Sequence, residues 1–220
     1  MNLQRAENPP RSGSSPLVVL AGNLGAGKTT LAGRLGERFG WWVGYESVND
    51  NPYLDDFYRD MGAWAFHLQI YFLNNRLRLH REAERMAQGS VLDRSIYEDR
   101  FIFAESLYEQ GHIPSREFQT YVNLFDAAVE ALRKPDLVIF VTAPTEALSE
   151  RLSRRAQTFD HNLPRRYLDK IGQKYVEWTR TLPADQLLVV DSTIADFSAD
   201  ALTSPGMEDI FSRISDMLES

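Results

Sequence analysis

The chain has 220 residues, and its 31 acidic and 24 basic side chains give a formal net charge of −7. This length favours one large domain, and the acidic balance argues against polymeric nucleic acid as a partner. The absence of cysteine excludes disulfides, thiolate zinc sites and thiol nucleophiles, and it suits a cytoplasmic protein.

Residues 1–16 are rich in Asn, Pro, Ser and Gly, so we expect a disordered tail before a single domain over residues 17–220. After the tail, short apolar, β-branched runs alternate with longer stretches of helical character. Apolar runs without alternation are typical of strands buried on both faces of a parallel sheet. The chain therefore predicts a three-layer α/β fold with a central five-stranded parallel sheet. The predicted strands are residues 17–21, 42–45, 91–92, 137–141 and 187–190, and the predicted helices include residues 31–39, 64–86 and 115–132.

A glycine-rich loop follows the first predicted strand. Residues 22–29 read G-N-L-G-A-G-K-T and match the phosphate-binding pattern G-x-x-x-x-G-K-[ST], with a helix-forming stretch directly behind. Glycines let such a loop wrap around phosphates with its N–H groups pointing inward, while Lys28 would reach the β and γ phosphates and Thr29 would hold Mg²⁺. A purely structural glycine turn is the alternative, but it gives no reason for the lysine and the hydroxyl. The expected ATP-binding residues here are Gly22, Asn23, Leu24, Gly25, Ala26, Gly27, Lys28, Thr29 and Thr30.

The loop alone leaves open whether the chain is a switch, a motor or a small-molecule kinase. The sequence contains no N-K-x-D segment for reading guanine, and its single D-x-x-G match, Asp169 to Gly172, lies inside a helical stretch. These features disfavour a GTPase.

Charged side chains follow the second and third predicted strands, where ligands of open α/β sheets bind. Glu46 ends the second strand and could accept the proton of an attacking hydroxyl, although a solvated glutamate is the alternative. Asp93 and Arg94 leave the third strand together. Asp93 is placed for Mg²⁺ or its water shell and Arg94 for an oxyanion or the attacking 5′ oxygen, whereas an N-capping Asp with an Arg ion pair is the structural alternative.

In order and spacing, these motifs resemble the deoxynucleoside kinase family, especially its bacterial deoxyadenosine/deoxyguanosine kinase branch. The resemblance implies that Glu46 is the general base for the nucleoside 5′-hydroxyl and that Arg94 is its partner, with Lys28 as the third catalytic residue. It also rests on residues 51–54 (N-P-Y-L), Trp64, Phe66, Gln69 and an arginine-containing lid over residues 151–163.

The same resemblance implies which side chains read the base. Gln69 and Arg76 are seven residues apart, so they lie about 20° apart around a helix and share one face. Asp99 would pair with Arg76, and Phe103 would stack on the base. Without the resemblance, an exposed helix face and a core phenylalanine would be the simpler interpretations. A pocket with an arginine and an aspartate suits purines or cytosine better than thymine, and we expect a purine.

The segment 151–166 holds five arginines and one acid, a local charge of +4 that leaves −11 for the rest of the chain. The resemblance makes it the lid over the donor, with Arg151 and Arg155 turned to the phosphates. A solvated basic helix end is the alternative. The family's lid commonly has an arginine where Gln157 stands and a glutamate where Asp160 stands, so one charge is missing and one carboxylate is shorter.

Two further pairs come only from the resemblance. Tyr58 and Asp160 are similar to the family's pair that holds the 3′-hydroxyl of the nucleoside. Asp196 and Phe197 follow the last predicted strand and look like the loop that contacts the adenine of ATP.

Together, these residues predict an ATP-dependent kinase of deoxynucleotide salvage. Its acceptor would be the 5′-hydroxyl of a purine deoxyribonucleoside, deoxyguanosine or deoxyadenosine, and Mg²⁺, held by Thr29 and Asp93, would be its only metal. A nucleoside monophosphate kinase is the closest alternative, although Glu46 would repel an acceptor that is already ionised. A nucleotide-binding regulatory module without chemistry is the other.

The expected partners besides ATP and the nucleoside are few. The resemblance implies a homodimer, with residues 64–86 and 115–132 as the candidate contact. No apolar run in the sequence approaches the ~20 residues of a membrane span, and no signal-peptide core stands near the N-terminus. We therefore expect a cytoplasmic protein with neither membrane nor nucleic acid as a partner.

Overall fold

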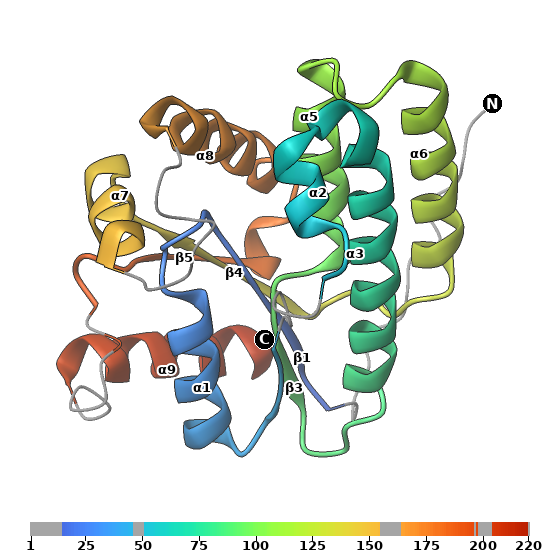
Figure 1. The fold of residues 1–220 in the computed structure, drawn as a ribbon. Coiled ribbons are helices and arrows are strands. Elements are labelled where there is room, and N and C mark those ends of the chain that lie inside the picture. The colour runs from blue at the N-terminus through green and yellow to red at the C-terminus, as the bar shows by residue number, and fades with distance from the viewer. Residues whose placement is uncertain (1–14, 46–50, 155–163, 196, 198–203, 220) are drawn as a thin grey trace.

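The computed structural model of the protein describes residues 15–45, 51–154, 164–195, 197 and 204–219. Within this part of the chain, five parallel strands form one sheet in the order β2-β3-β1-β4-β5 (Figure 1). The predicted α/β class and the five parallel strands are thereby confirmed. The strands are β1 (Leu17–Ala21), β2 (Trp42–Gly44), β3 (Ser90–Asp93), β4 (Leu137–Thr142) and β5 (Leu187–Asp191).

Two helices cover one face of the sheet (Figure 1). They are α1 (Lys28–Phe39), which follows β1 through the phosphate loop, and α9 (Pro205–Glu219). Val18 and Leu20 of β1 form one apolar cluster with side chains of both helices, among them Leu31 and Phe211.

The opposite face is covered by α3 (Met61–Ala83) and α8 (Arg165–Thr179). Leu17 and Val19, the alternate residues of β1, cluster with Ala83 of α3. Consecutive side chains of a strand point to opposite faces, so β1 is buried on both sides. The three-layer architecture is confirmed.

A continuous helical segment leads away from β3. It consists of α4 (Ile96–Glu98), the π-helix η1 (Asp99–Ala104) and α5 (Glu105–Glu109). π turns are rare and occur frequently at functional sites. Here the wider turn begins at Asp99, one of the predicted base-reading residues.

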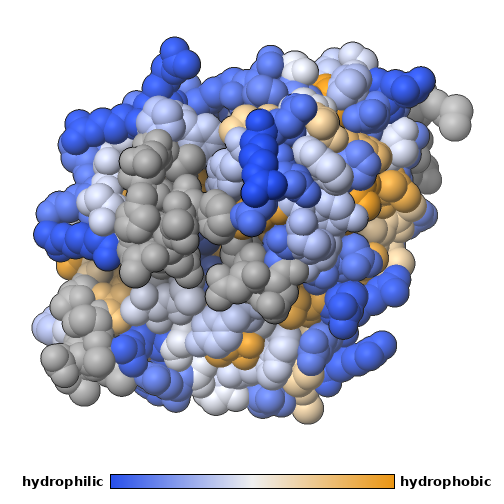
Figure 2. All heavy atoms as spheres, viewed as in Figure 1, coloured by the Kyte–Doolittle hydropathy of each residue, from blue (hydrophilic) through white to orange (hydrophobic). Residues whose placement is uncertain are grey.

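The remaining helices complete the outer layers. Figure 2 shows the same view as Figure 1: hydrophilic side chains predominate, and apolar side chains gather on the side where α3 and α6 lie. In α6, Tyr121 and Phe125 are buried against α3 and η1. These helices are α2 (Leu54–Arg59), α6 (Ser115–Glu130), α7 (Thr145–Arg154) and the 3-10 helix η2 (Ala184–Gln186).

The long helix predicted over residues 64–86 is present as α3, but it begins and ends three residues earlier. Its start is explained by Asp60, whose side chain accepts a hydrogen bond from the backbone N–H of Ala63 at 3.1 Å. None of the helices in the described part of the chain is long and apolar enough to cross a membrane.

Candidate active site

The phosphate loop connects β1 to α1 and requires its glycines. Gly22 has a φ of +147°, and a Cβ there would lie 2.3 Å from the carbonyl oxygen of Val141. Gly27 has a φ of +99°, and its Cβ would lie 3.1 Å from the ring of Phe197. Side chains at either position would meet both backbone strain and a close neighbour. The loop ends at the N-terminus of α1, where free N–H groups favour an anion.

Lys28 lies inside this loop. Its side chain is buried, and its ammonium donates hydrogen bonds to the carbonyls of Gly22 at 2.7 Å and Asn23 at 3.0 Å. The Asn23 amide in turn donates to the carbonyl of Leu168 in α8 at 2.7 Å and accepts from the N–H of Leu24 at 2.8 Å. Hydrogen bonds from Lys28 within the loop, and one from Asn23 to α8, therefore fix the conformation of the loop.

The two predicted metal ligands lie next to each other. The hydroxyl of Thr29 donates a hydrogen bond of 2.5 Å to the carboxylate of Asp93 at the end of β3. Both are hard oxygen donors of the kind that Mg²⁺ prefers, and Mg²⁺ is usually held by one or two such groups together with substrate phosphates. The described residues contain no group of three or more His, Cys, Asp or Glu side chains that could hold a metal alone. The donor set thus fits a Mg²⁺ ion bound together with nucleotide.

Arg94 occupies the corner between β3 and α4. It is the only non-glycine residue with a positive φ in the described part of the chain, at 81°. Its N–H donates to the carbonyl of Leu20 at 3.1 Å, and its guanidinium carbon lies 4.7 Å from the centre of the Phe103 ring. Strained backbone of this kind is found mostly at functional sites. The predicted stacking residue Phe103 therefore lies against the predicted catalytic arginine.

The predicted base-reading side chains are buried inside the protein, and two of them meet. Gln69, Arg76 and Asp99 are only 3%, 4% and 2% exposed. The Nε of Arg76 lies 3.3 Å from Oδ2 of Asp99, so the expected ion pair is present. The amide oxygen of Gln69 has no hydrogen-bond partner among the described residues. An exposed helix face is therefore excluded for Gln69 and Arg76.

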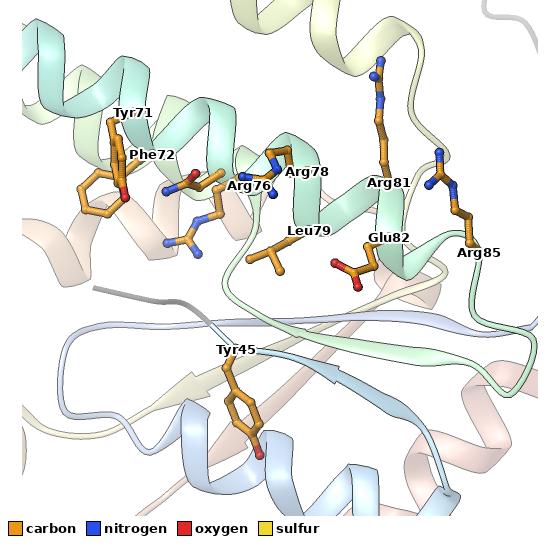
Figure 3. Close-up of a pocket in the computed structure, with 10 residues that line it drawn as sticks. Tyr45, Tyr71, Phe72, Arg76, Arg78, Leu79, Arg81, Glu82 and Arg85 are labelled. Atoms are coloured by element: carbon orange, nitrogen blue, oxygen red, sulfur yellow. The ribbon is translucent and has the colours of Figure 1, made fainter. Parts of the chain in front are cut away.

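A cavity of about 600 Å³ opens beside Arg76, between α3 and the end of β2 (Figure 3). Arg76 lines it together with Phe72 and with Tyr45, the residue before Glu46. Arg81 and Arg85 belong to its rim and extend away from Tyr45 in Figure 3. The buried Arg76 thus borders a cavity that Tyr45 also lines.

On the donor side, Arg151 of α7 already has partners. Its guanidinium donates to the hydroxyl and the carbonyl of Ser192, at 2.7 and 2.8 Å. Phe197 is buried and lies against Gly27 of the phosphate loop. Arg151 also donates to the carbonyls of Gly25 and Ala26 at 3.4 Å, so Arg151 and Phe197 both border the loop.

The other predicted site residues are either exposed or outside the described part of the chain. Tyr58, on α2, is 39% exposed and packs against Phe57. The positions of four further residues lie outside the described part of the chain, and their roles stay predictions. These are Glu46, Arg155, Asp160 and Asp196.

One buried carboxylate at the site is absent from the predicted set. Glu98 is completely buried and accepts hydrogen bonds from the Tyr175 hydroxyl at 2.7 Å and the Ser95 N–H at 2.8 Å. Burial raises the pKa of Glu98, while the positive charges of Arg94 and Lys28 act in the opposite direction. The capping-box spacing S-x-x-E at residues 95–98 was a readable signal for the first contact. Nothing local could indicate Tyr175, which lies 77 residues away.

Comparison with known proteins agrees with this geometry. The family model described as deoxynucleoside kinase matches residues 18–219. A deoxyadenosine/deoxycytidine kinase of Bacillus subtilis is 35% identical over 164 residues, covering 74% of this chain and 76% of the relative. A deoxyguanosine kinase of the same bacterium is 30% identical over 192 residues, covering 84% and 90%. The fold of a deoxyadenosine kinase from M. mycoides, solved with dCMP and a flexible dCDP, superposes with a TM-score of 0.78 at 24% identity, covering 91% and 99%. The chain belongs to the deoxynucleoside kinase family and is a deoxynucleoside kinase.

Proposed function

We propose that this kinase transfers the γ-phosphoryl group of ATP to the 5′-hydroxyl of a purine deoxyribonucleoside, deoxyadenosine or deoxyguanosine, in nucleotide salvage. The observation that carries the proposal is the burial of Gln69 together with the buried Arg76–Asp99 ion pair, the Gln69 amide oxygen lacking a partner among the described residues. Buried polar groups are costly unless they are hydrogen-bonded. A polar ligand that enters between α3 and η1 would supply the hydrogen bond that the Gln69 oxygen lacks.

The chemistry of this trio suits a base with an exocyclic amine. Gln69 can accept from such an amine through its unpartnered oxygen. Guanine presents O6 and N7 to an arginine, and adenine presents its amine to a carboxylate, whereas thymine has no amine. The names of the two B. subtilis relatives, which mention deoxyadenosine, deoxycytidine and deoxyguanosine, point the same way.

The reaction depends mostly on positioning and charge, as phosphoryl transfer generally does. Glu46 accepts the proton of the 5′-hydroxyl as its oxygen attacks, and Arg94 stabilises the negative charge that develops there. Lys28 and the loop N–H groups hold the phosphates. A Mg²⁺ ion, for which Thr29 and Asp93 are the candidate ligands, would neutralise phosphate charge.

The remaining proposed contacts bind the other parts of the nucleoside and of ATP. Tyr58 and Asp160 hold the 3′-hydroxyl of the nucleoside. Phe103, whose ring lies next to the Arg94 guanidinium, stacks on the base. On the donor side, the proposed contacts are the lid arginines Arg151 and Arg155 with the phosphates, and Asp196 and Phe197 with the adenine of ATP.

We further propose a cytoplasmic homodimer that forms through α3 and α6. The apolar side chains in Figure 2 gather on this side, and Leu124 of α6 is 48% exposed although it is a large apolar residue. Light scattering after size-exclusion chromatography would distinguish a mass near 50 kDa, twice the 25.2 kDa of one chain, from that of a monomer.

The experiment that tests the function is a substrate panel. The purified full chain is given ATP and Mg²⁺ with each of the four deoxynucleosides and, separately, with each monophosphate, and ADP release and product are measured. We expect the largest kcat/KM for deoxyadenosine or deoxyguanosine, deoxycytidine as a weaker substrate, and no turnover of monophosphates. A larger kcat/KM for deoxycytidine or thymidine than for either purine would overturn the purine assignment.

A further inference from the structure

The carboxylate of Glu98 is buried one helical turn after the catalytic corner, yet it belongs to neither the phosphate loop nor the base-reading trio. Its Oε2 accepts hydrogen bonds from the N–H and the hydroxyl of Ser95, at 2.8 and 3.3 Å, and its Oε1 accepts one from the Tyr175 hydroxyl at 2.7 Å. A buried charge is tolerated only when such donors replace water. Its three hydrogen bonds join the corner at β3 to α8.

These contacts hold the backbone on both sides of Arg94. The Arg94 N–H donates to Leu20 of β1 at 3.1 Å, and the next N–H, that of Ser95, donates to Glu98 at 2.8 Å. Between these two anchors Arg94 keeps a φ of 81°, which non-glycine residues rarely adopt. The direction of the Arg94 side chain, which extends over Phe103, follows from this fixed backbone.

The third donor comes from a helix that also touches the phosphate loop. Tyr175 is fully buried in α8 and stacks on Phe140 of β4 at 5.7 Å. Two turns earlier on α8, the carbonyl of Leu168 accepts from the Asn23 amide at 2.7 Å. Residues seven apart lie on the same helix face, about 10 Å along the axis. One helix therefore contacts the donor loop at one point and the acceptor corner at another.

We propose that Glu98 and Tyr175 are positioning residues for Arg94. Through the hydrogen bond between them, α8 fixes the position of the Arg94 corner relative to the phosphate loop. The inference rests on the proposed function, in which Arg94 stabilises the attacking oxygen. Displacing Arg94 by a fraction of an ångström would weaken its contact with the reacting oxygen more than the binding of either substrate. The loss would therefore fall on kcat.

The first test is Tyr175→Phe, which keeps the ring and its stacking on Phe140 and removes only the donor to Glu98. We expect kcat to fall by about tenfold or more, with the KM values for ATP and nucleoside within about twofold of the original. A neutral carboxamide can still accept from Ser95, so Glu98→Gln should retain more kcat than Glu98→Ala. Equal kcat for all these variants and the original chain would overturn the inference.

The matched control is Lys174→Met, the neighbouring residue on α8. Lys174 donates to Glu109 of α5 at 2.7 Å, so the variant cuts another attachment of the same helix without touching Glu98. We expect its kcat to stay within about twofold of the original. If Lys174→Met and Tyr175→Phe lower kcat equally, general loosening of α8 explains both and the positioning role is wrong.

A double-variant cycle shows whether Tyr175 acts through Arg94. If it does, Arg94→Met with Tyr175→Phe will be no slower than Arg94→Met alone, because the residue being positioned is already absent. If the double variant instead loses kcat by the product of the two single-variant factors, the inference is overturned. Arg94→Met with full kcat would instead overturn the proposed role of Arg94 itself. Should Tyr175→Phe fail to fold, as judged by circular dichroism, Glu98→Gln takes its place in the same cycle.

Discussion

The guanidinium of Arg76 and the carboxylate of Asp99 form an ion pair of 3.3 Å in which each side chain is only 3% exposed. The pair connects α3 to the π-helix η1, and Gln69, which is also buried, lies seven residues before Arg76 on α3. A buried pair of this kind is rarely retained for stability, because apolar residues of similar volume would serve as well. Its place beside the cavity of Figure 3 is instead consistent with a site that recognises a polar ligand.

Breaking this pair should change both stability and base preference. Asp99→Asn leaves the buried Arg76 without its counter-charge, and we expect a loss of about 3 kcal/mol or more in the free energy of unfolding. The order of kcat/KM values among deoxynucleosides should change as well. Urea denaturation and the substrate panel measure the two effects. The exposed pair Arg154–Glu150 provides the control, since Arg154→Gln should cost less than about 1 kcal/mol. An unchanged order of nucleosides would show that the base is read elsewhere.

Replacing the predicted general base should affect the chemical step alone. Glu46→Gln keeps the size of the side chain but cannot take the proton of the 5′-hydroxyl, so kcat should fall by about 10²- to 10⁴-fold. The affinity for ATP, followed by titration with a fluorescent ATP analogue, should be unchanged because the role proposed for Glu46 concerns the acceptor alone. A variant with full kcat would remove Glu46 from this role.

The contact between Thr29 and Asp93 predicts how the enzyme depends on Mg²⁺. Thr29→Val removes one of the proposed oxygen ligands, and the Mg²⁺ concentration for half-maximal activity should rise by about tenfold or more. Thr29→Ser keeps the hydroxyl and should behave like the original chain. If valine and serine give the same Mg²⁺ titration curve, Thr29 is not a ligand.

The glycines of the phosphate loop can be compared with a glycine outside it. Gly40 has a φ of +68°, and a Cβ there would have no neighbouring atom within 4 Å, so Gly40→Ala should cost only backbone strain, about 1–2 kcal/mol. Gly22→Ala adds a clash with the Val141 carbonyl and should cost about 1–3 kcal/mol more. Thermal unfolding gives both values. Equal losses would mean that the loop can move away from β4.

His80 should make the protein less stable in mild acid. It is fully buried, its Nε2 contacts the carbonyl of Arg133 at 2.8 Å, and burial holds its pKa below the ordinary value of 6.5. The unfolded chain therefore binds a proton that the folded chain resists, so stability falls as the pH drops below about 6.5, by at most about 1.4 kcal/mol per pH unit. Urea denaturation of the original chain and of His80→Gln between about pH 8 and pH 5 checks this. The free-energy difference between them should change in this window, and parallel curves would contradict the prediction.

Several features could be predicted because their physical causes are local. The strand 17–21 is apolar throughout because both its faces are covered, and the loop after it needs glycine at each strained position. Gln69 and Arg76 share a face because helix geometry alone places them there. Glu98 shows the limit: its capping contact with Ser95 is readable from the spacing S-x-x-E, but its contact with Tyr175 is not.

The sequence by itself therefore determined the α/β class, the phosphate loop and the residues that leave the ends of the strands, since each depends on composition or on neighbours within a few positions. Only the tertiary structure decided the strand order β2-β3-β1-β4-β5, the burial of Arg76 with Asp99, and the link from Asn23 through α8 to Glu98. These contacts join residues 23 to 145 positions apart, and they depend on how whole helices pack against the sheet. Such packing is a property of the complete core, which no short segment of the sequence contains.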